Sequence, residues 1–329
     1  MIVSIVVLAA AVICGAIFLI TFLPRFNQMQ SDPLDLPTET PIPGNELDED
    51  GTSTPPLCGD EPEMTILLVG IDYRDNGYLY GLADVIRLIH VDFTTADVNV
   101  VALPRAIVVE ETGPNLDMPT PALLNQAYLY GTAGMGHYTG SGNGAGALAE
   151  TIQTNFDVRA DNYVVVNFVA FQTIVNRLGG VEITLPEAVD ARPAAFFPAG
   201  TQVLDGTDAL ILARNRKNSS DNARIDTQSI LIRGILQKLM SPSTIPQLPG
   251  LFDALSSSIL TDITAQQVQT AVCMADKVNL DEIQFFNPSL ELITDSRVYI
   301  PSVGKEMNVF LWDQDLVDWI QQSLAAQPD

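Results

Sequence analysis

The stretch from Met64 to Arg105 decides the fold. Residues 64–72 read MTILLVGID, residues 84–93 read DVIRLIHVDF and residues 98–105 read VNVVALPR. Each is a short run rich in Val, Ile and Leu, which is typical of β-strands. Because the turn at residues 94–97 is short, we predict an antiparallel meander of three strands. A meander brings the end of the first strand, the start of the second and the end of the third to one edge of the sheet.

Charged residues stand at all three of these strand ends. Asp72 closes the first strand, Asp84 opens the second and Arg105 follows the third. Carboxylate oxygens are hard ligands for a divalent cation, and Mg²⁺ bound in this way usually shares its shell with substrate phosphates. The alternative is that the two aspartates only form turns, as aspartates at strand ends often do. The edge is therefore a candidate metal and phosphate site.

The rest of the chain predicts a mixed α/β (α+β) fold, with a central, largely antiparallel sheet flanked by helices. Helical patterns cover residues 121–130, 144–156, 169–178, 206–214 and 225–240, and strand patterns cover 163–168 and 181–185. After residue 241, helical patterns cover residues 251–259, 265–278 and 311–324, and a short strand covers 297–300.

A basic cluster stands out in a very acidic chain. The formal net charge is -24 and the isoelectric point is about 4.1, which argues against binding of nucleic acid through general electrostatics. Nevertheless, four of the 16 basic residues fall in one segment: Arg214, Arg216, Lys217 and Arg224. Guanidinium groups present planar forks that match phosphate oxygens, so the segment is a candidate phosphate clamp. The alternative is a solvated basic surface, or pairing with Asp221 and Asp226.

The N-terminus predicts a single membrane anchor. Ile2–Leu23 is an almost unbroken apolar run of about 20 residues, the length that a helix needs to cross a bilayer. Residues 26–63 carry many Asp, Glu, Pro and Thr residues, which is typical of an extracytoplasmic spacer without a fold. We therefore predict an anchor at 1–25, a disordered linker at 26–63, a main domain at 64–240 and an extension at 241–329 that packs on it.

Two cysteines lie outside the predicted anchor, Cys58 and Cys273. On an oxidising side of the membrane two such thiols can pair, and we predict that they form a disulfide. The alternative is two unrelated thiols.

Other common catalytic signatures are missing from the sequence. The glycine-rich residues 131–146 lack a nucleotide-binding motif, and we predict a mobile lid there. With only two histidines, the chain gives little support to a hydrolase triad or a zinc site.

Taken in order, these motifs resemble the LytR-CpsA-Psr family over roughly Met64–Met240. The resemblance is carried by ILLVGIDYR at 66–74, Ala83–Asp84, Leu103–Arg105, LNQAY at 124–128, the LGGV that ends at Val181, LDG at 204–206, and Arg214-Asn215-Arg216 through Asp221 and Arg224 to Gln228. Each motif is short, but their order and spacing are specific.

The resemblance implies a bacterial, single-pass membrane phosphotransferase with its domain outside the cytoplasm. Such enzymes move a glycopolymer from a polyprenyl diphosphate carrier to peptidoglycan or another acceptor, with Mg²⁺ (or Mn²⁺). By position, Asp72 and Asp84 would hold the metal, and Arg105 and Asp84 would serve catalysis. The phosphates would be held by six residues: Arg74, Arg105, Arg214, Arg216, Arg224 and Gln228.

Three positions depart from the family pattern. Leu82 and Thr227 stand where the family usually has arginine, and Ala106 stands where an aspartate follows Pro-Arg. Two other functions therefore stay open, a non-catalytic binder of lipid-linked anionic glycans and a diphosphatase that uses water as the acceptor. Asp84 is also a candidate general base, a role that the sequence does not separate from metal binding.

Overall fold

The computed structural model describes residues 29–36, 55–73, 80–215, 221–239, 241, 244, 259–275 and 277–327. The predicted membrane span lies outside these residues. Within them, no helix combines the length and the apolar composition needed to cross a membrane.

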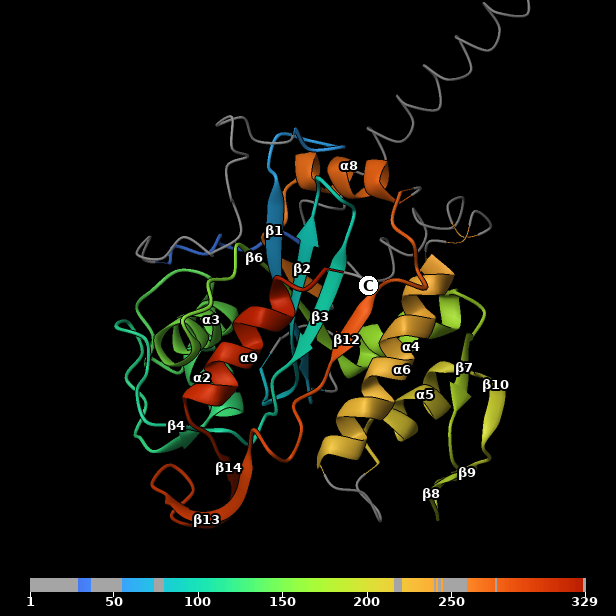
Figure 1. Cartoon of the computed structure of the whole chain (residues 1–329). Coiled ribbons are helices and arrows are strands. Elements are labelled where there is room, and N and C mark those ends of the chain that lie inside the picture. Colours follow the sequence, from blue (N-terminus) through green and yellow to red (C-terminus); the bar gives the residue numbers. More distant parts are fainter. Residues whose placement is uncertain are drawn as a thin grey trace, which may run out of the picture.

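A six-stranded mixed sheet forms the centre of the molecule, with the strand order β11-β6-β1-β2-β3-β12 (Figure 1). The strands are β1 (Glu63–Ile71), β2 (Ala83–Asp92), β3 (Val98–Ala102), β6 (Asn162–Asn167), β11 (Ile259–Thr261) and β12 (Gln284–Phe286). β1, β2 and β3 pair antiparallel, so the predicted meander is confirmed. β6 runs parallel to β1, and β12 runs parallel to β3.

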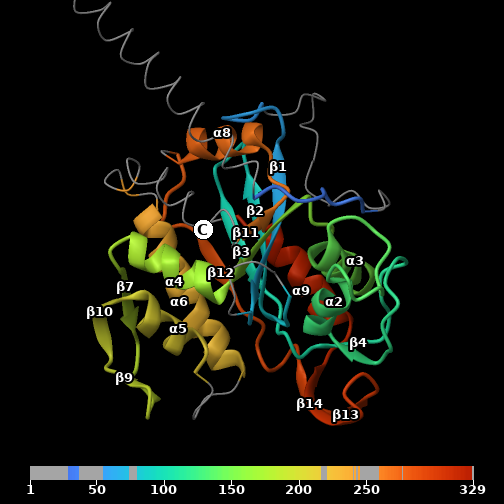
Figure 2. The same cartoon turned by 180° about the vertical axis from the view of Figure 1, so that it is seen from behind.

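Helices cover both faces of the sheet. One face packs on α2 (Leu124–Gly131), α3 (Asn143–Phe156) and α9 (Gln314–Leu324), and the other face packs on α4 (Phe168–Arg177) and α6 (Asp221–Leu239). Seen from behind in Figure 2, the two groups of helices lie on opposite sides of the strands. The alternation of side chains along the strands explains this layering, because successive residues point to opposite faces.

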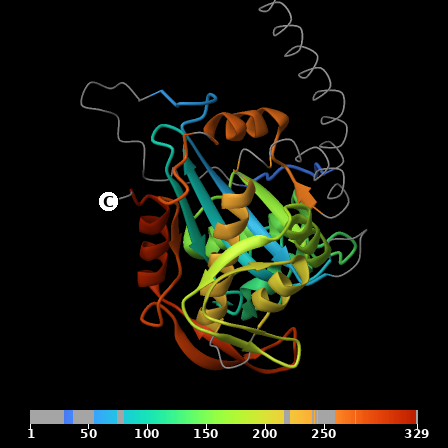
Figure 3. The ribbon, with the colours of Figure 1, turned by 90° about the vertical axis from the view of Figure 1, so that its right-hand side faces the viewer.

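A smaller unit extends the fold beyond α4 and α6. It contains β7 (Val181–Leu185), β10 (Gly200–Leu204), α5 (Gly206–Ala213) and the hairpin of β8 (Val189–Ala191) and β9 (Ala195–Phe197). Its apolar residues form a second core with α4 and α6, and Figure 3 shows its strands in front of the central sheet.

The chain beyond Leu239 differs in part from the prediction. It supplies both outer strands of the central sheet, β11 and β12, which are too short, at 3 residues each, for a strand pattern to show in the sequence. It also forms α8 (Ala265–Met274) and the hairpin of β13 (Thr294–Ile300) and β14 (Lys305–Leu311). The helices predicted over 265–278 and 311–324 are confirmed as α8 and α9, and α9 begins at Gln314 because β14 extends to Leu311. β14 in turn lies beside β4 (Val108–Val109), which pairs with β5 (Ala122–Leu123).

Part of the predicted linker is folded. Residues 29–36 lie against the domain, with Met29 and Leu36 buried and the Ser31 amide donating to the Thr261 carbonyl at 2.9 Å. Further along, Cys58 forms a disulfide with Cys273 on α8. The expectation of a spacer without a fold is wrong for residues 29–36, because their apolar side chains find partners in the core.

The glycine-rich segment is also held in place. Glu150 on α3 is 1% exposed and accepts hydrogen bonds from the Tyr138 hydroxyl at 2.8 Å and from Asn115 Nδ2 at 2.9 Å. Burial and the neighbouring Glu150 carboxylate raise the pKa of Tyr138 well above its usual range, so this hydroxyl stays protonated as a donor. The Tyr138 bond ties the middle of residues 131–146 to α3 and argues against the predicted lid.

Candidate functional site

A β-bulge shapes the sheet edge where the candidate residues meet. Gly70 pairs with Val85 and Ile71 pairs with Ala83, so Asp84 is an extra residue on β2 with no partner across the strand pair. Bulges bend the strand and re-aim side chains, and they are common beside active sites. The strand pattern in the sequence predicted the edge but not the bulge.

Asp84 and Arg105 form an ion pair at this edge. Their side chains are only 17% and 16% exposed, so water screens the pair less than it would on an open surface. The backbone holds Arg105 in position, because the amides of Asn125 and Leu124 at the start of α2 donate to the carbonyls of Arg105 and Ile107 at 3.2 and 2.9 Å. The LNQAY motif therefore anchors the segment that carries Arg105.

Asp72 lies at the same edge and closes the loop between β1 and β2. Its carboxylate Oδ1 accepts the Leu82 amide at 2.8 Å, and its own amide donates to the Leu82 carbonyl at 3.2 Å. A side chain at Gly81 would lie 2.8 Å from the same carboxylate oxygen, which explains the glycine. Asp72 thus supports the turn through one of its two carboxylate oxygens.

The edge can contribute carboxylates to a metal ion, but too few to bind it alone. In the described part of the chain, no group of three or more His, Cys, Asp or Glu side chains is arranged to hold a metal. Asp72 and Asp84 offer the hard oxygens that Mg²⁺ prefers, and Mg²⁺ takes its remaining ligands from water and from substrate phosphates. A metal ion at this edge would therefore need phosphate oxygens in addition to Asp72 and Asp84.

Arg214 reaches this edge from the end of α5. Its guanidinium carbon lies 4.6 Å from the centre of the Phe168 ring, a cation–π contact. Phe168 directly follows β6, and its amide donates to the Tyr73 carbonyl at 3.2 Å, beside Asp72. Arg214 is exposed and available to a ligand, while Arg74 and Arg216 lie outside the described residues.

Arg224 and Gln228 lie on α6, deeper in the molecule, with 5% and 6% of their surfaces exposed. The helix starts at Asp221, four residues before the predicted start at Ile225, so Gln228 sits inside the helix instead of near its beginning. Gln228 Nε2 donates to the carbonyl of Ala213 at 3.3 Å. This bond ties α6 to the end of α5, next to Arg214.

The sequence prediction missed Arg87, which lies behind this group. Arg87 is on β2, is 1% exposed and donates from Nη2 to the Ile225 carbonyl at 3.2 Å and to Gln228 Oε1 at 3.4 Å. A lone arginine inside the apolar run of residues 85–89 was the signal that could have revealed it.

The family model of the LytR_cpsA_psr family matches residues 45–319. The chain belongs to the LytR-CpsA-Psr family. The match includes most of the segment after residue 240, which agrees with the position of β11 and β12 in the central sheet.

Several LytR-CpsA-Psr relatives are similar to the chain. The polyisoprenyl-teichoic acid–peptidoglycan teichoic acid transferase TagU of Oceanobacillus iheyensis is 28% identical over 217 residues, which cover 65% of this chain and 63% of that protein. TagT of Bacillus subtilis, a transferase of the same description, is 29% identical over 211 residues, which cover 61% of this chain and 60% of that protein. The chain thus matches somewhat less than two thirds of the length of these two relatives.

Solved structures share the fold. The crystal structure of TagV of B. subtilis superposes with a TM-score of 0.60 at 22% identity, covering 81% of this chain and 97% of that one. A protein from Streptococcus agalactiae superposes with a TM-score of 0.64 at 22% identity, covering 81% of this chain and 89% of that one.

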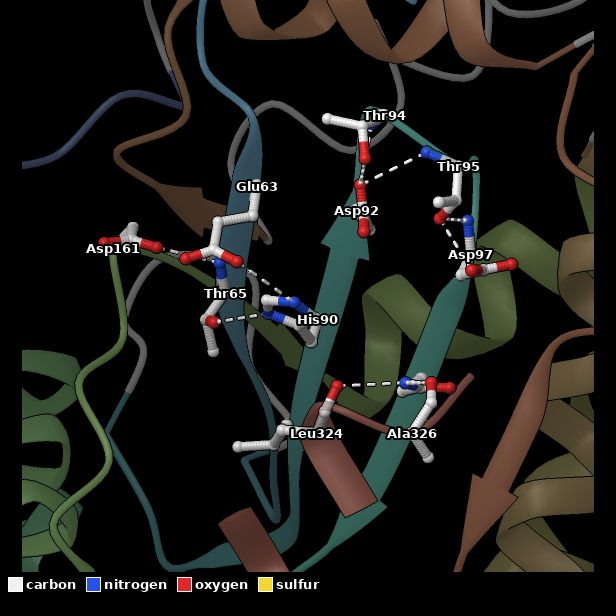
Figure 4. Close-up of polar contacts among 11 residues, drawn as sticks. Glu63, Thr65, His90, Asp92, Thr94, Thr95, Asp97, Asp161, Leu324 and Ala326 are labelled. Carbon is white, nitrogen blue, oxygen red and sulfur yellow. Dashed lines mark hydrogen bonds and ion pairs between the residues drawn. The ribbon is translucent and has the colours of Figure 1, made fainter. Parts of the chain in front are cut away.

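A second polar cluster lies at the opposite end of the central strands, where β1 begins and β2 ends (Figure 4). His90 is 7% exposed, its Nδ1 lies 3.1 Å from the Thr65 hydroxyl and its Nε2 lies 3.7 Å from Glu63. Asp161 accepts the Thr65 amide at 2.8 Å. Burial lowers the pKa of His90 and raises that of Glu63. These residues join β1, β2 and the start of β6, and the family motifs do not include them.

Proposed function

We propose that the protein is an extracytoplasmic, membrane-anchored phosphotransferase that moves a glycopolymer from a polyprenyl diphosphate carrier to peptidoglycan or another envelope acceptor. The proposal is supported by the Asp84–Arg105 ion pair at the sheet edge and by the exposed Arg214, which stacks on Phe168 beside the end of β1, in a chain whose net charge is -24. Family membership and the printed names of the relatives support the same reaction.

In the proposed reaction, a hydroxyl of the acceptor attacks the phosphorus that carries the sugar, in line with the leaving group. The bond between that phosphorus and the bridging oxygen breaks, a new phosphodiester joins polymer and acceptor, and the carrier leaves as a monophosphate. Positive charge stabilises the negative charge that collects on the bridging oxygen. In this proposal, the guanidinium groups of Arg105 and Arg214 supply that charge, and the carboxylate of Asp84 serves either as the base that accepts the hydroxyl proton or as a metal ligand.

Asp72 and Asp84 would hold Mg²⁺ (or Mn²⁺) together with the phosphates of the donor, and the metal would add positive charge at the diphosphate. Arg74 and Arg216 are proposed as further phosphate ligands on sequence grounds alone. The membrane anchor and the location outside the cytoplasm likewise rest on the apolar run at residues 2–23 and on the family.

The test is an incubation of the full-length chain in detergent with a synthetic prenyl-diphosphate glycan and purified peptidoglycan. Transfer to peptidoglycan supports the proposal, release of free phosphoglycan indicates a diphosphatase, and binding without turnover indicates a binding protein. Arg105→Ala should lose turnover. Arg297→Ala, which removes an arginine that is 67% exposed and pairs only with Glu306 among the described ion pairs, is the matched control.

A further inference from the structure

Arg87 carries a buried charge that its described neighbours do not balance. Its guanidinium donates to two backbone carbonyls and to an amide oxygen, none of which is charged. Its Nε has no hydrogen-bond partner among the residues that the structure describes, and none of the ion pairs in that part of the chain includes it. A buried charge is costly unless an opposite charge accompanies it.

The neighbouring groups increase this imbalance. Arg224 is buried beside Arg87, one residue before the Ile225 carbonyl that Arg87 binds. Burial first, and then the charge of Arg224, lower the pKa of Arg87 to about 10, while Asp226 opposes the shift. Asp226 is exposed, and its carboxylate accepts a hydrogen bond from Asn287 Nδ2 at 2.6 Å. Its hydrogen-bond partner is therefore Asn287, and it does not form an ion pair with Arg87 among the described contacts.

Gln228 connects Arg87 to the candidate site. Its Oε1 accepts from Arg87, and its Nε2 donates to the Ala213 carbonyl, next to Arg214. Arg87 therefore fixes which way the amide of Gln228 faces and holds the α6 backbone beside Arg224. Its charge also adds to the positive potential around the buried Arg224, where low exposure to water strengthens it.

We propose that Arg87 is a positioning residue of the diphosphate site. It is a buried cation behind Arg224 and Gln228, and the diphosphate of the lipid-linked donor is its counter-charge. The inference rests on the proposed function and adds a residue that the family motifs do not include. It also offers a source of positive charge in a chain that has Leu82 and Thr227 at two positions where the family usually has arginine.

Calorimetry of geranyl diphosphate binding to the full-length chain in detergent tests this role. Arg87→Met should bind at least about tenfold more weakly than the parent, while its melting temperature stays equal or rises, because an apolar side chain of similar length removes the cost of a buried charge. Arg87→Lys should also bind weakly, since a buried ammonium loses its proton easily and lacks the fork. The control Arg297→Met also removes one arginine and should bind like the parent.

A folded Arg87→Met variant that binds geranyl diphosphate like the parent overturns the inference and leaves the proposed function standing. If Arg87→Met does not fold, Arg87→Gln decides by the same criterion, because it keeps a hydrogen-bond donor for the Ile225 carbonyl. A folded parent that fails to bind geranyl diphosphate overturns the proposed function, and the role of Arg87 fails with it.

Discussion

Removing the Cys58–Cys273 disulfide should lower the stability of the protein substantially without disturbing the site. The two cysteines are 215 residues apart in sequence, so the cross-link closes a long loop in the unfolded chain. The loss of loop entropy corresponds to about 5 kcal/mol at 25 °C, an upper value because unfolded chains keep some structure. The bond joins the residues before β1 to α8, which lies at the end of the sheet opposite the start of β2, so ligand binding should survive (Figure 1).

The assay is urea unfolding of the full-length chain in detergent, with the oxidised parent compared with the Cys58→Ala Cys273→Ser variant. The reduced parent is the matched control, since it retains both side chains and lacks only the bond. We expect the variant and the reduced parent to lose several kcal/mol each and to bind geranyl diphosphate normally. A difference of less than about 1 kcal/mol between oxidised and reduced parent would refute the reasoning from loop entropy.

Three further predictions concern single side chains. Arg214→Lys should weaken geranyl diphosphate binding about tenfold in calorimetry with little change in melting temperature, because it loses the planar fork and the stacking of that fork on Phe168; unchanged affinity would contradict the clamp. Asp72→Asn and Asp84→Asn should each reduce Mg²⁺-dependent turnover about a hundredfold, and a fully active Asp72→Asn variant would leave that residue as a turn former only. His90→Gln should reduce the loss of folding stability at acid pH. Burial lowers the pKa of His90 below its usual 6.5, so the stability linked to its neutral form is present above pH 6.5 and is lost as the pH falls below it. Thermal melts from pH 8 to 5 give the free energy of unfolding of parent and variant at each pH. Below pH 6.5 the parent should lose up to about 1.4 kcal/mol per pH unit more than the variant, and an equal pH dependence of the two proteins would count against the prediction.

The sheet edge could be predicted from sequence because strand runs and short turns are local signals. Antiparallel pairing places Asp72, Asp84 and Arg105 at the same edge of the sheet. The bulge at Asp84 could not be predicted, since one extra residue barely changes an alternating pattern.

Contacts between distant segments were harder to foresee. β11 and β12 depend on pairing with strands far away in the sequence, and their 3 residues each give no periodicity. The burial of Met29 and Leu36 likewise depends on surfaces supplied by the folded domain, while composition indicated an unfolded linker. Arg87 shows the same limit, because only the position of α6 reveals that its charge lies behind Gln228.

The most direct test of the central claim follows the fate of the carrier lipid. The full-length chain in detergent is incubated with Mg²⁺ and a prenyl-diphosphate glycan, with and without peptidoglycan, and mass spectrometry measures prenyl monophosphate and glycan-linked peptidoglycan. A phosphotransferase predicts that the two products form in equal amounts, that both need the acceptor, and that both are lost in Arg105→Ala. Release of monophosphate at the same rate without peptidoglycan, or no release by a chain that binds the donor, would contradict it.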